Sequence, residues 1–166
     1  GMLLSKSMKV VGAFNHLHIF LDPNPDPKAS FAERKRLFEL PRSSWEDYND
    51  ALISEGGGVF PRQAKEIQLS TPVQEMLGTE ESVLSGESLI HHLLQADVDL
   101  LWNGGIGTYL KSDDETHADV SDKANDGVRV DASELGAKVV GEGGNLGATQ
   151  SGRVEFNRLG GRSNTD

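Results

Sequence analysis

Residues 98–109, VDLLWNGGIGTY, join a short apolar run to a glycine-rich segment that begins abruptly at Asn103. This pattern predicts a buried strand followed by a loop with few side chains. A second stretch, KVVGEGGNLG at residues 138–147, repeats the arrangement. Ligands of open α/β sheets bind just beyond the carboxyl ends of the strands. We therefore expect the two strand-to-glycine junctions to form two walls of one crevice.

Helix signals alternate with strand signals along the chain. The spacing predicts helices over residues 2–12, 31–40, 71–77 and 88–96, and strands over residues 16–21, 98–102 and 137–141. Ser30 is the expected N-cap of the second helix. We expect a surface excursion over residues 111–127, a helical turn over 133–136, and a polar tail without a closing element over 150–166. The alternation predicts an α/β fold with a parallel sheet.

Composition limits the class of protein. The chain has 166 residues, with 16 Lys and Arg against 26 Asp and Glu and a net charge of −10, and it is expected to form one domain. The negative charge argues against nucleic acid and anionic membranes as partners, because phosphate binding needs a basic face. No apolar run approaches the roughly 20 residues of a membrane span. The lack of cysteines excludes a disulfide scaffold and is compatible with the cytoplasm.

Asp22 is the first candidate binding residue. It follows the predicted strand 16–21 directly. An acidic residue at that place in dinucleotide folds accepts hydrogen bonds from the adenosine ribose hydroxyls. Its charge would repel a 2′-phosphate, and the next basic residue is Lys28, so NAD is favoured over NADP. The alternative is a solvent-exposed turn residue before Pro23.

The two glycine-rich junctions supply the other candidates. Asn103, Gly104 and Gly105 would let the main chain approach a ligand closely while the amide offers a donor and an acceptor. Gly144 and Asn145 are interpreted in the same way. The alternative is a pair of ordinary tight turns.

Several familiar sites are absent from the sequence. The glycine runs that begin at Gly56, Gly105 and Gly141 all lack the third glycine of the dinucleotide fingerprint, and no Walker-type phosphate loop occurs. There is no Gly-x-Ser-x-Gly elbow. The histidine pairs 16/18 and 91/92 lack a third ligand at zinc spacing, so we expect no metal site.

Seven stretches are more distinctive than any of these motifs. They are residues 12–26 (GAFNHLHIFLDPNPD), 44–49 (SWEDYN), 56–62 (GGGVFPR), 99–109 (DLLWNGGIGTY), 124–130 (ANDGVRV), 141–147 (GEGGNLG) and 160–166 (GGRSNTD). In these stretches, which extend over nearly the whole chain, the sequence resembles the large bacterial NAD-specific glutamate dehydrogenases.

The resemblance implies a reaction and a role for each candidate. The family oxidises L-glutamate to 2-oxoglutarate and ammonia and transfers a hydride to NAD. Asp22 would hold the adenosine ribose. Asn103, Gly104 and Gly105 would line the nicotinamide side of the cleft, and Asn145 would contact the nicotinamide ribose or carboxamide. Gly144 is expected to be a further cofactor-binding residue.

The resemblance also implies what the chain lacks. It predicts an NAD-binding domain over residues 1–166 with a three-layer, Rossmann-like, mainly parallel sheet, without the first strand and its glycine-rich loop, which belong before Met2. The family's catalytic Lys and Asp lie further upstream, so no catalytic residue is assigned and the isolated chain should be inactive. An open central sheet edge invites association, so the gap would be closed by re-pairing, by a partner chain or by a foreign segment. We expect a homo-oligomer. The alternatives are a truncated, non-catalytic nucleotide-binding or oligomerisation module and the same fold with an unrelated nucleotide.

Overall fold

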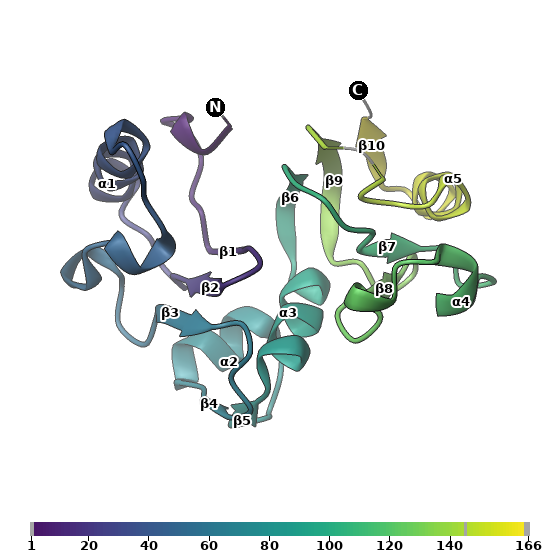
Figure 1. Cartoon of the computed structure of the whole chain (residues 1–166), viewed down its shortest axis with the longest axis horizontal. Helices are drawn as coiled ribbons and strands as arrows, with labels where there is room; N and C mark the ends of the chain where they lie inside the picture. The colour runs from purple at the N-terminus through teal and green to yellow at the C-terminus, as the bar shows by residue number, and fades with distance from the viewer. Residues whose placement is uncertain (1, 145, 165–166) are drawn as a thin grey trace. The chain divides into compact units, whose positions relative to one another are not determined.

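The computed structural model describes residues 2–144 and 146–164. The chain divides into two compact units, Gly1–Glu87 and Ser88–Asp166, and each is described here by itself. Both units combine helices with short strands (Figure 1), so the predicted α/β class is confirmed in its broad form. The expectation of a mainly parallel sheet holds for the second unit only, because the sheets of the first unit are antiparallel.

The main sheet of the first unit has three strands in the order β1-β2-β3: β1 (Gly12–Phe14), β2 (His18–Leu21) and β3 (Gly58–Pro61). A tight turn joins β1 to β2, and Asn15 Oδ1 accepts hydrogen bonds from the amides of Leu17 and His18, each at 2.8 Å. A connection this short permits only antiparallel pairing. The predicted strand 16–21 is thus confirmed as β2, and all four of its residues are buried.

An aromatic cluster forms the core beside this sheet. Phe20 lies with its ring centroid 4.7 Å from Trp45 and 4.8 Å from Tyr48. Helix α1 (Pro27–Glu39) adds Leu37 to the cluster. Trp45 belongs to the short helix η2 (Trp45–Asp47), which Ser44 caps. Further along lie η3 (Asp50–Leu52), α2 (Thr71–Leu77) and the antiparallel pair β4 (Ile67–Gln68) and β5 (Val83–Leu84).

Two predictions for the first unit are wrong. Residues 2–12 form only a short helix, η1 (Met2–Leu4), and otherwise run extended. Arg34 of α1 donates to the carbonyl oxygens of Leu3 and Met8, at 2.7 and 3.3 Å, which removes acceptors that a continuous helix would need. Helix α1 begins at Pro27 instead of residue 31, because the Asp26 carboxylate caps it with a 2.7 Å bond from the amide of Ala29.

The second unit contains a parallel sheet of order β10-β9-β6, formed by β6 (Val98–Asn103), β9 (Ala137–Glu142) and β10 (Arg162–Asn164). Helix α3 (Gly86–Gln95) precedes β6, and helix α5 (Gln150–Arg158) connects β9 to β10. The expectation of a tail without a closing element is therefore wrong. The segment after β9 forms a βαβ crossover, and its helix begins at a Thr149 N-cap.

Strand β6 exists where it was predicted, but it is not buried. Leu100 is 37 % exposed and Trp102 is 40 % exposed. Among the residues that the structure describes, β6 pairs with β9 alone and is an edge strand. The Trp102 ring lies over Gly141 and Gly143, and a Cβ on either glycine would come within 2.7 Å of it. The apolar sequence therefore predicts the strand correctly, but it does not show that Leu100 and Trp102 stay partly exposed.

The region between β6 and β9 is more ordered than its composition suggests. It contains β7 (Leu110–Lys111), α4 (His117–Val120), η4 (Lys123–Asn125) and β8 (Val130–Asp131), with β7 parallel to β8. The prediction of a surface excursion over 111–127 holds for most of these residues, which are exposed, but Lys111, Ser112 and Asn125 are buried. Residues 133–136 contain no helical turn.

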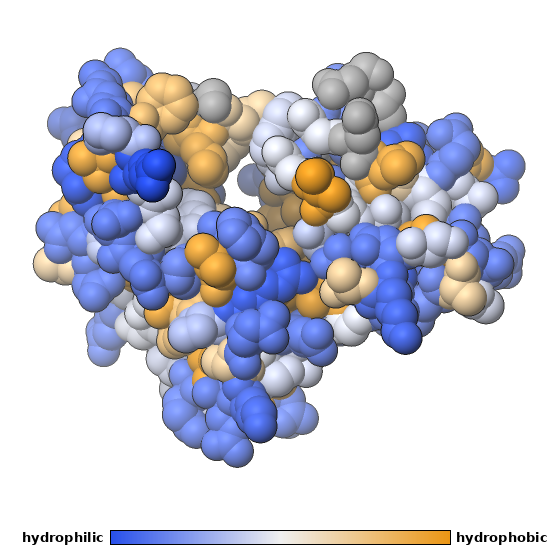
Figure 2. Space-filling model, in the orientation of Figure 1, coloured by the Kyte–Doolittle hydropathy of each residue, from blue (hydrophilic) through white to orange (hydrophobic). Residues whose placement is uncertain are grey.

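Hydrophilic side chains cover most of the face shown in Figure 2, with hydrophobic residues scattered among them. Within residues 2–144 and 146–164, no helix is both long and apolar enough to cross a membrane.

Candidate functional site

The two strand-to-glycine junctions lie side by side in the second unit. β6 and β9 are parallel and in register, with Trp102 opposite Gly141 and Asn103 opposite Glu142. The pairing continues past the strand ends, where the amide of Gly143 donates to the carbonyl oxygen of Asn103 at 2.9 Å. The two junctions thus lie at one edge of the sheet, while the crevice that they were expected to line stays a prediction. We call residues 103–107 the first glycine loop and residues 143–147 the second.

Glycines allow the two loops to approach each other. A Cβ on Gly144 would overlap the carbonyl oxygen of Gly105, and one on Gly147 would overlap the amide group of Asn103. Backbone in such close contact cannot accept a larger residue without moving apart. Gly144 is therefore required by the loop pairing itself, whatever the loops bind, whereas a side chain at Gly147 would displace the Asn103 side chain.

Hydrogen bonds join the segments that follow the loops. Thr108 Oγ1 donates to the carbonyl oxygen of Leu146 at 2.7 Å. The carbonyl oxygen of Gly147 accepts from the amides of Tyr109 and Leu110, at 2.8 and 3.2 Å. Leu110 and Ala148 then form a parallel bridge. The loops thus have a paired segment before and after them, which limits their freedom to move apart.

The predicted residues of the first loop differ in their surroundings. A Cβ on Gly105 would have no atom within 4 Å, so this glycine faces open space. The Nδ2 atom of Asn103 is buried and makes no hydrogen bond to any described residue. A Cβ on Gly104 would lie 3.2 Å from the Trp102 indole nitrogen. Of the second loop, Gly144 is described above, and Asn145 lies outside the described residues.

Asp22 belongs to the first unit, where its side chain is fully buried. The alternative of an exposed turn residue is therefore wrong. Its Oδ1 atom accepts from the hydroxyl and the amide of Ser54, at 2.5 and 3.2 Å. Its Oδ2 atom is buried without a hydrogen-bond partner among the described residues. Burial raises the pKa of Tyr48 to about 12, and the Asp22 charge contributes to that rise.

Sequence reasoning missed a buried ion pair beneath the second loop. Glu142, the last residue of β9, is 1 % exposed in its side chain. Arg153 of α5 donates to it through Nε at 2.8 Å and through Nη2 at 3.0 Å. The same carboxylate accepts a 3.0 Å bond from the amide of Gly147. The available signal was a carboxylate directly after the uncharged run 139–141.

A second buried cation, Arg129, organises the segment after the first loop. Its side chain is 0 % exposed. The guanidinium donates to the carbonyl oxygens of Thr108 and Asp122, at 2.8 and 2.7 Å, and to Asp126 Oδ1 at 2.7 Å. The Asp122 carboxylate in turn accepts a 2.9 Å bond from the amide of Thr108. Arg129 therefore fixes Thr108, the residue that directly follows the first glycine loop.

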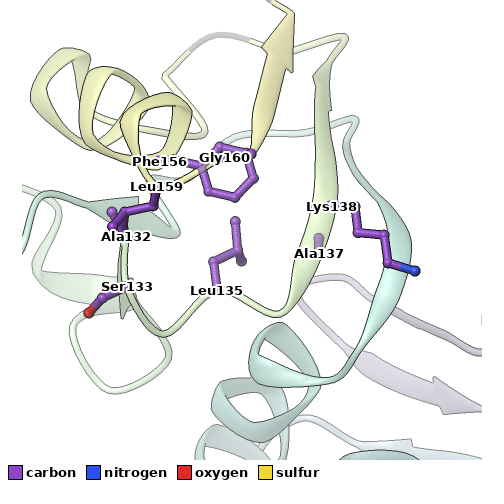
Figure 3. A pocket seen from close by; sticks show the side chains of 9 residues that line it. Ala132, Ser133, Leu135, Ala137, Lys138, Phe156, Leu159 and Gly160 are labelled. Atoms are coloured by element: carbon purple, nitrogen blue, oxygen red, sulfur yellow. The ribbon is translucent and has the colours of Figure 1, made fainter.

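A cavity of about 420 Å³ in the second unit lies away from the loops (Figure 3). It is lined by residues near the starts of β9 and β10, including Leu135, Ala137, Phe156 and Gly161. The glycine loops follow the carboxyl ends of β6 and β9, so the cavity does not belong to the candidate site. Within the described ranges, no group of three or more His, Asp or Glu residues could hold a metal ion.

Comparison with known proteins gives one consistent result. Residues 1–166 match the family model described as bacterial NAD-glutamate dehydrogenase, catalytic domain. The chain is 61 % identical, over all 166 residues, to proteins of Halomonas elongata and Pseudomonas aeruginosa that are named NAD-specific glutamate dehydrogenase. A protein of the same name from Mycobacterium tuberculosis is 59 % identical over 172 residues. The match covers the whole chain but only 10–11 % of each relative, so the chain spans about a tenth of their length.

Proposed function

Since the chain belongs to the family of bacterial NAD-glutamate dehydrogenase catalytic domains, we propose that it is part of the NAD-binding region of such an enzyme. The enzyme would oxidise L-glutamate to 2-oxoglutarate and ammonia, and NAD, when bound, accepts the hydride. The observation that supports this proposal most directly is the pair of glycine loops at the carboxyl ends of β6 and β9. Parallel α/β sheets bind nucleotides at this edge.

The described residues of the second unit fit a nucleotide in two respects. Gly105 leaves open space where main chain could contact a ring. Asn103 offers a buried amide donor without a partner among the described residues, suited to a carboxamide or ribose oxygen. In the first unit, taken by itself, the Asp22 Oδ2 atom has no described hydrogen-bond partner and is suited to a ribose hydroxyl, which is a separate proposal. Buried polar atoms are usually hydrogen-bonded, so atoms without partners are candidates for ligand contacts.

The Rossmann-like architecture belongs to the same proposal. Strand β6 pairs on one side only, among the described residues, and exposes Leu100 and Trp102. We propose that a further strand of the longer enzyme pairs with this free edge. Cytoplasmic location and assembly into a homo-oligomer stay predictions from the sequence.

Replacing Gly105 with alanine tests the nicotinamide side of the site. A Cβ at this position would have no atom within 4 Å when no ligand is bound. The free energy of unfolding should therefore change by less than about 0.5 kcal/mol. If the loop contacts the nicotinamide end, the added methyl should weaken NADH binding roughly tenfold. Calorimetric titration of wild type and Gly105→Ala with NADH measures this effect.

ADP-ribose is the matched control ligand for Gly105→Ala because it lacks the nicotinamide ring. Its affinity should be the same for the variant and the wild type. Equal loss of NADH and ADP-ribose binding would place Gly105 elsewhere in the site. Wild-type protein that binds neither ligand would contradict the proposal for this chain.

The isolated chain should not oxidise glutamate, because the resemblance assigns its acid and base residues to other parts of the enzyme. Absorbance at the NADH band, recorded with saturating L-glutamate and NAD, should stay constant. Production of NADH that depends on both substrates, from protein free of host dehydrogenase, would show that catalytic groups lie within these residues.

A further inference from the structure

The carboxylate of Glu142 makes contacts in two directions. One set of bonds comes from Arg153 of α5, at 2.8 and 3.0 Å, and one bond comes from the amide of Gly147 in the second glycine loop, at 3.0 Å. A buried carboxylate is tolerated only when its lone pairs are satisfied in this way. Two nitrogen donors on one planar guanidinium also fix its orientation. Glu142 is therefore a rigid connection between helix α5 and the loop.

The loop that Glu142 contacts has an unusual backbone. Leu146 has a φ of +63°, and it is one of two described non-glycine residues with a positive φ. Its side chain is 69 % exposed, so packing does not explain this conformation. A leucine in the left-handed region is strained and persists only where its surroundings hold it.

Hydrogen bonds hold both ends of the peptide group that joins Leu146 to Gly147. Thr108 Oγ1 donates to its carbonyl oxygen at 2.7 Å. The next amide, that of Gly147, donates to Glu142. In the following peptide group, the carbonyl oxygen of Gly147 accepts a hydrogen bond from the amide of Tyr109. Glu142 supplies the one side-chain carboxylate in this set, and Arg153 keeps it in place.

We propose that Glu142 and Arg153 are positioning residues that hold the second glycine loop in its strained conformation and so place it against the nicotinamide end of NAD. This inference rests on the proposed function, since it assigns the loop to the cofactor. A pair that served only to attach α5 to the sheet would not need the bond to Gly147. The inference is that the bond from the Gly147 amide to the Glu142 carboxylate, which Arg153 orients, matters for NAD.

Two double variants separate these roles. Glu142→Gln with Arg153→Met removes both charges but keeps a carbonyl oxygen that accepts from Gly147. Glu142→Leu with Arg153→Met removes the same charges and the acceptor as well. The two proteins have equal net charge and no ion pair at this place, so they differ in the acceptor offered to the loop.

Amide hydrogen exchange of Gly147, followed by NMR, is the first measurement. We expect the exchange rate to be about fivefold or more higher in the Leu variant than in the Gln variant, as for the loss of one hydrogen bond. The wild-type Gly147 amide should be protected. Fast exchange in the wild type would overturn the proposal without any variant, which covers the case in which the Leu variant does not fold.

NADH titration is the second measurement. The Leu variant should bind NADH about fivefold more weakly than the Gln variant, while ADP-ribose binding should be equal. If the pair has only a structural role, the two variants should have equal affinities for NADH as well as for ADP-ribose. That outcome would overturn the positioning role. Exchange at Gly147 can differ as expected while wild-type protein binds no NADH. The proposed function then fails, and with it the link between the loop and the cofactor. The role of Glu142 in holding Gly147 would still be supported.

Discussion

Replacing Arg129 with methionine should lower the free energy of unfolding of the second unit by about 2–4 kcal/mol, since buried polar groups left without a hydrogen-bond partner cost about 1–3 kcal/mol each. The remaining Asp126 carboxylate is 35 % exposed, so water can hydrate it. Methionine keeps much of the aliphatic volume, so lost packing contributes little. The large term is the set of acceptors left without a donor. They are the Thr108 and Asp122 carbonyl oxygens and the Asp126 carboxylate, all within 2.7–2.8 Å of the guanidinium.

Native-state amide exchange in β9 measures this loss in the second unit alone. The matched control is Lys138→Met, which removes a cation from the same unit but from its surface. Lys138 is 64 % exposed and pairs with Asp99 at 2.9 Å. Exposed pairs contribute little, so exchange in β9 should not change measurably. Similar effects of the two substitutions would show that Arg129 does not act through its buried acceptors.

Arg129 also shows that the composition of residues 111–127 does not reveal a buried charge contact. The segment is acidic and polar, which favours a surface excursion in the sequence. In the structure its carboxylates surround a buried guanidinium that lies beyond the segment in sequence. An acidic segment is typical of an exposed surface. No local sequence pattern shows that Asp122 and Asp126 pair with the buried Arg129.

The glycine loops were predictable for the opposite reason. An apolar run that stops at Asn103, and a second that stops at Gly141, are local signals of strand ends. Parallel strands bring their carboxyl ends to one edge, so the meeting of the loops follows from topology. Helix α2 was predictable in the same way, from Pro72 near its start and Gly78 at its end, although its N-cap is Ser70 and not Thr71.

Long-range contacts account for most of the errors. The segment 2–12 has a mixed apolar pattern, but Arg34 binds its carbonyls from a helix some thirty positions away. The Glu142–Arg153 pair was overlooked because Arg153 lies in a segment expected to be an unstructured tail. In both cases an arginine side chain decides the local backbone, and its partner is visible only after folding.

Asp22 falls between these cases. Its position at the end of a strand was predictable, and that part is confirmed. Its burial was not, because proline residues on its carboxyl side suggest an exposed turn. Ser54 comes from thirty-two positions away to cover it. The role of Asp22 toward a ribose stays a proposal that nucleotide titration of an Asp22→Asn variant can examine.

The first unit should lose stability as the pH rises from about 10 to about 12, and Tyr48 should cause much of this loss. Burial raises the pKa of Tyr48 to about 12, with a further contribution from the Asp22 charge, while Arg34 opposes the rise. Above about pH 10, the unfolded tyrosine loses its proton while the folded one keeps it. The unfolded state then binds fewer protons, so stability falls with pH. Two pKa units correspond to about 2–3 kcal/mol.

Unfolding of wild type and Tyr48→Phe, compared at about pH 8 and about pH 11.5, tests this prediction. Tyr48 is 3 % exposed, and its hydroxyl makes no hydrogen bond to any described residue. Phenylalanine should therefore keep the packing against Phe20 and cost little at the lower pH. At the higher pH the variant should be the more stable protein. Tyr109→Phe, which removes the other of the chain's two tyrosines, should keep the wild-type loss. Equal losses in wild type and Tyr48→Phe would assign the alkaline transition to lysines instead of this buried phenol.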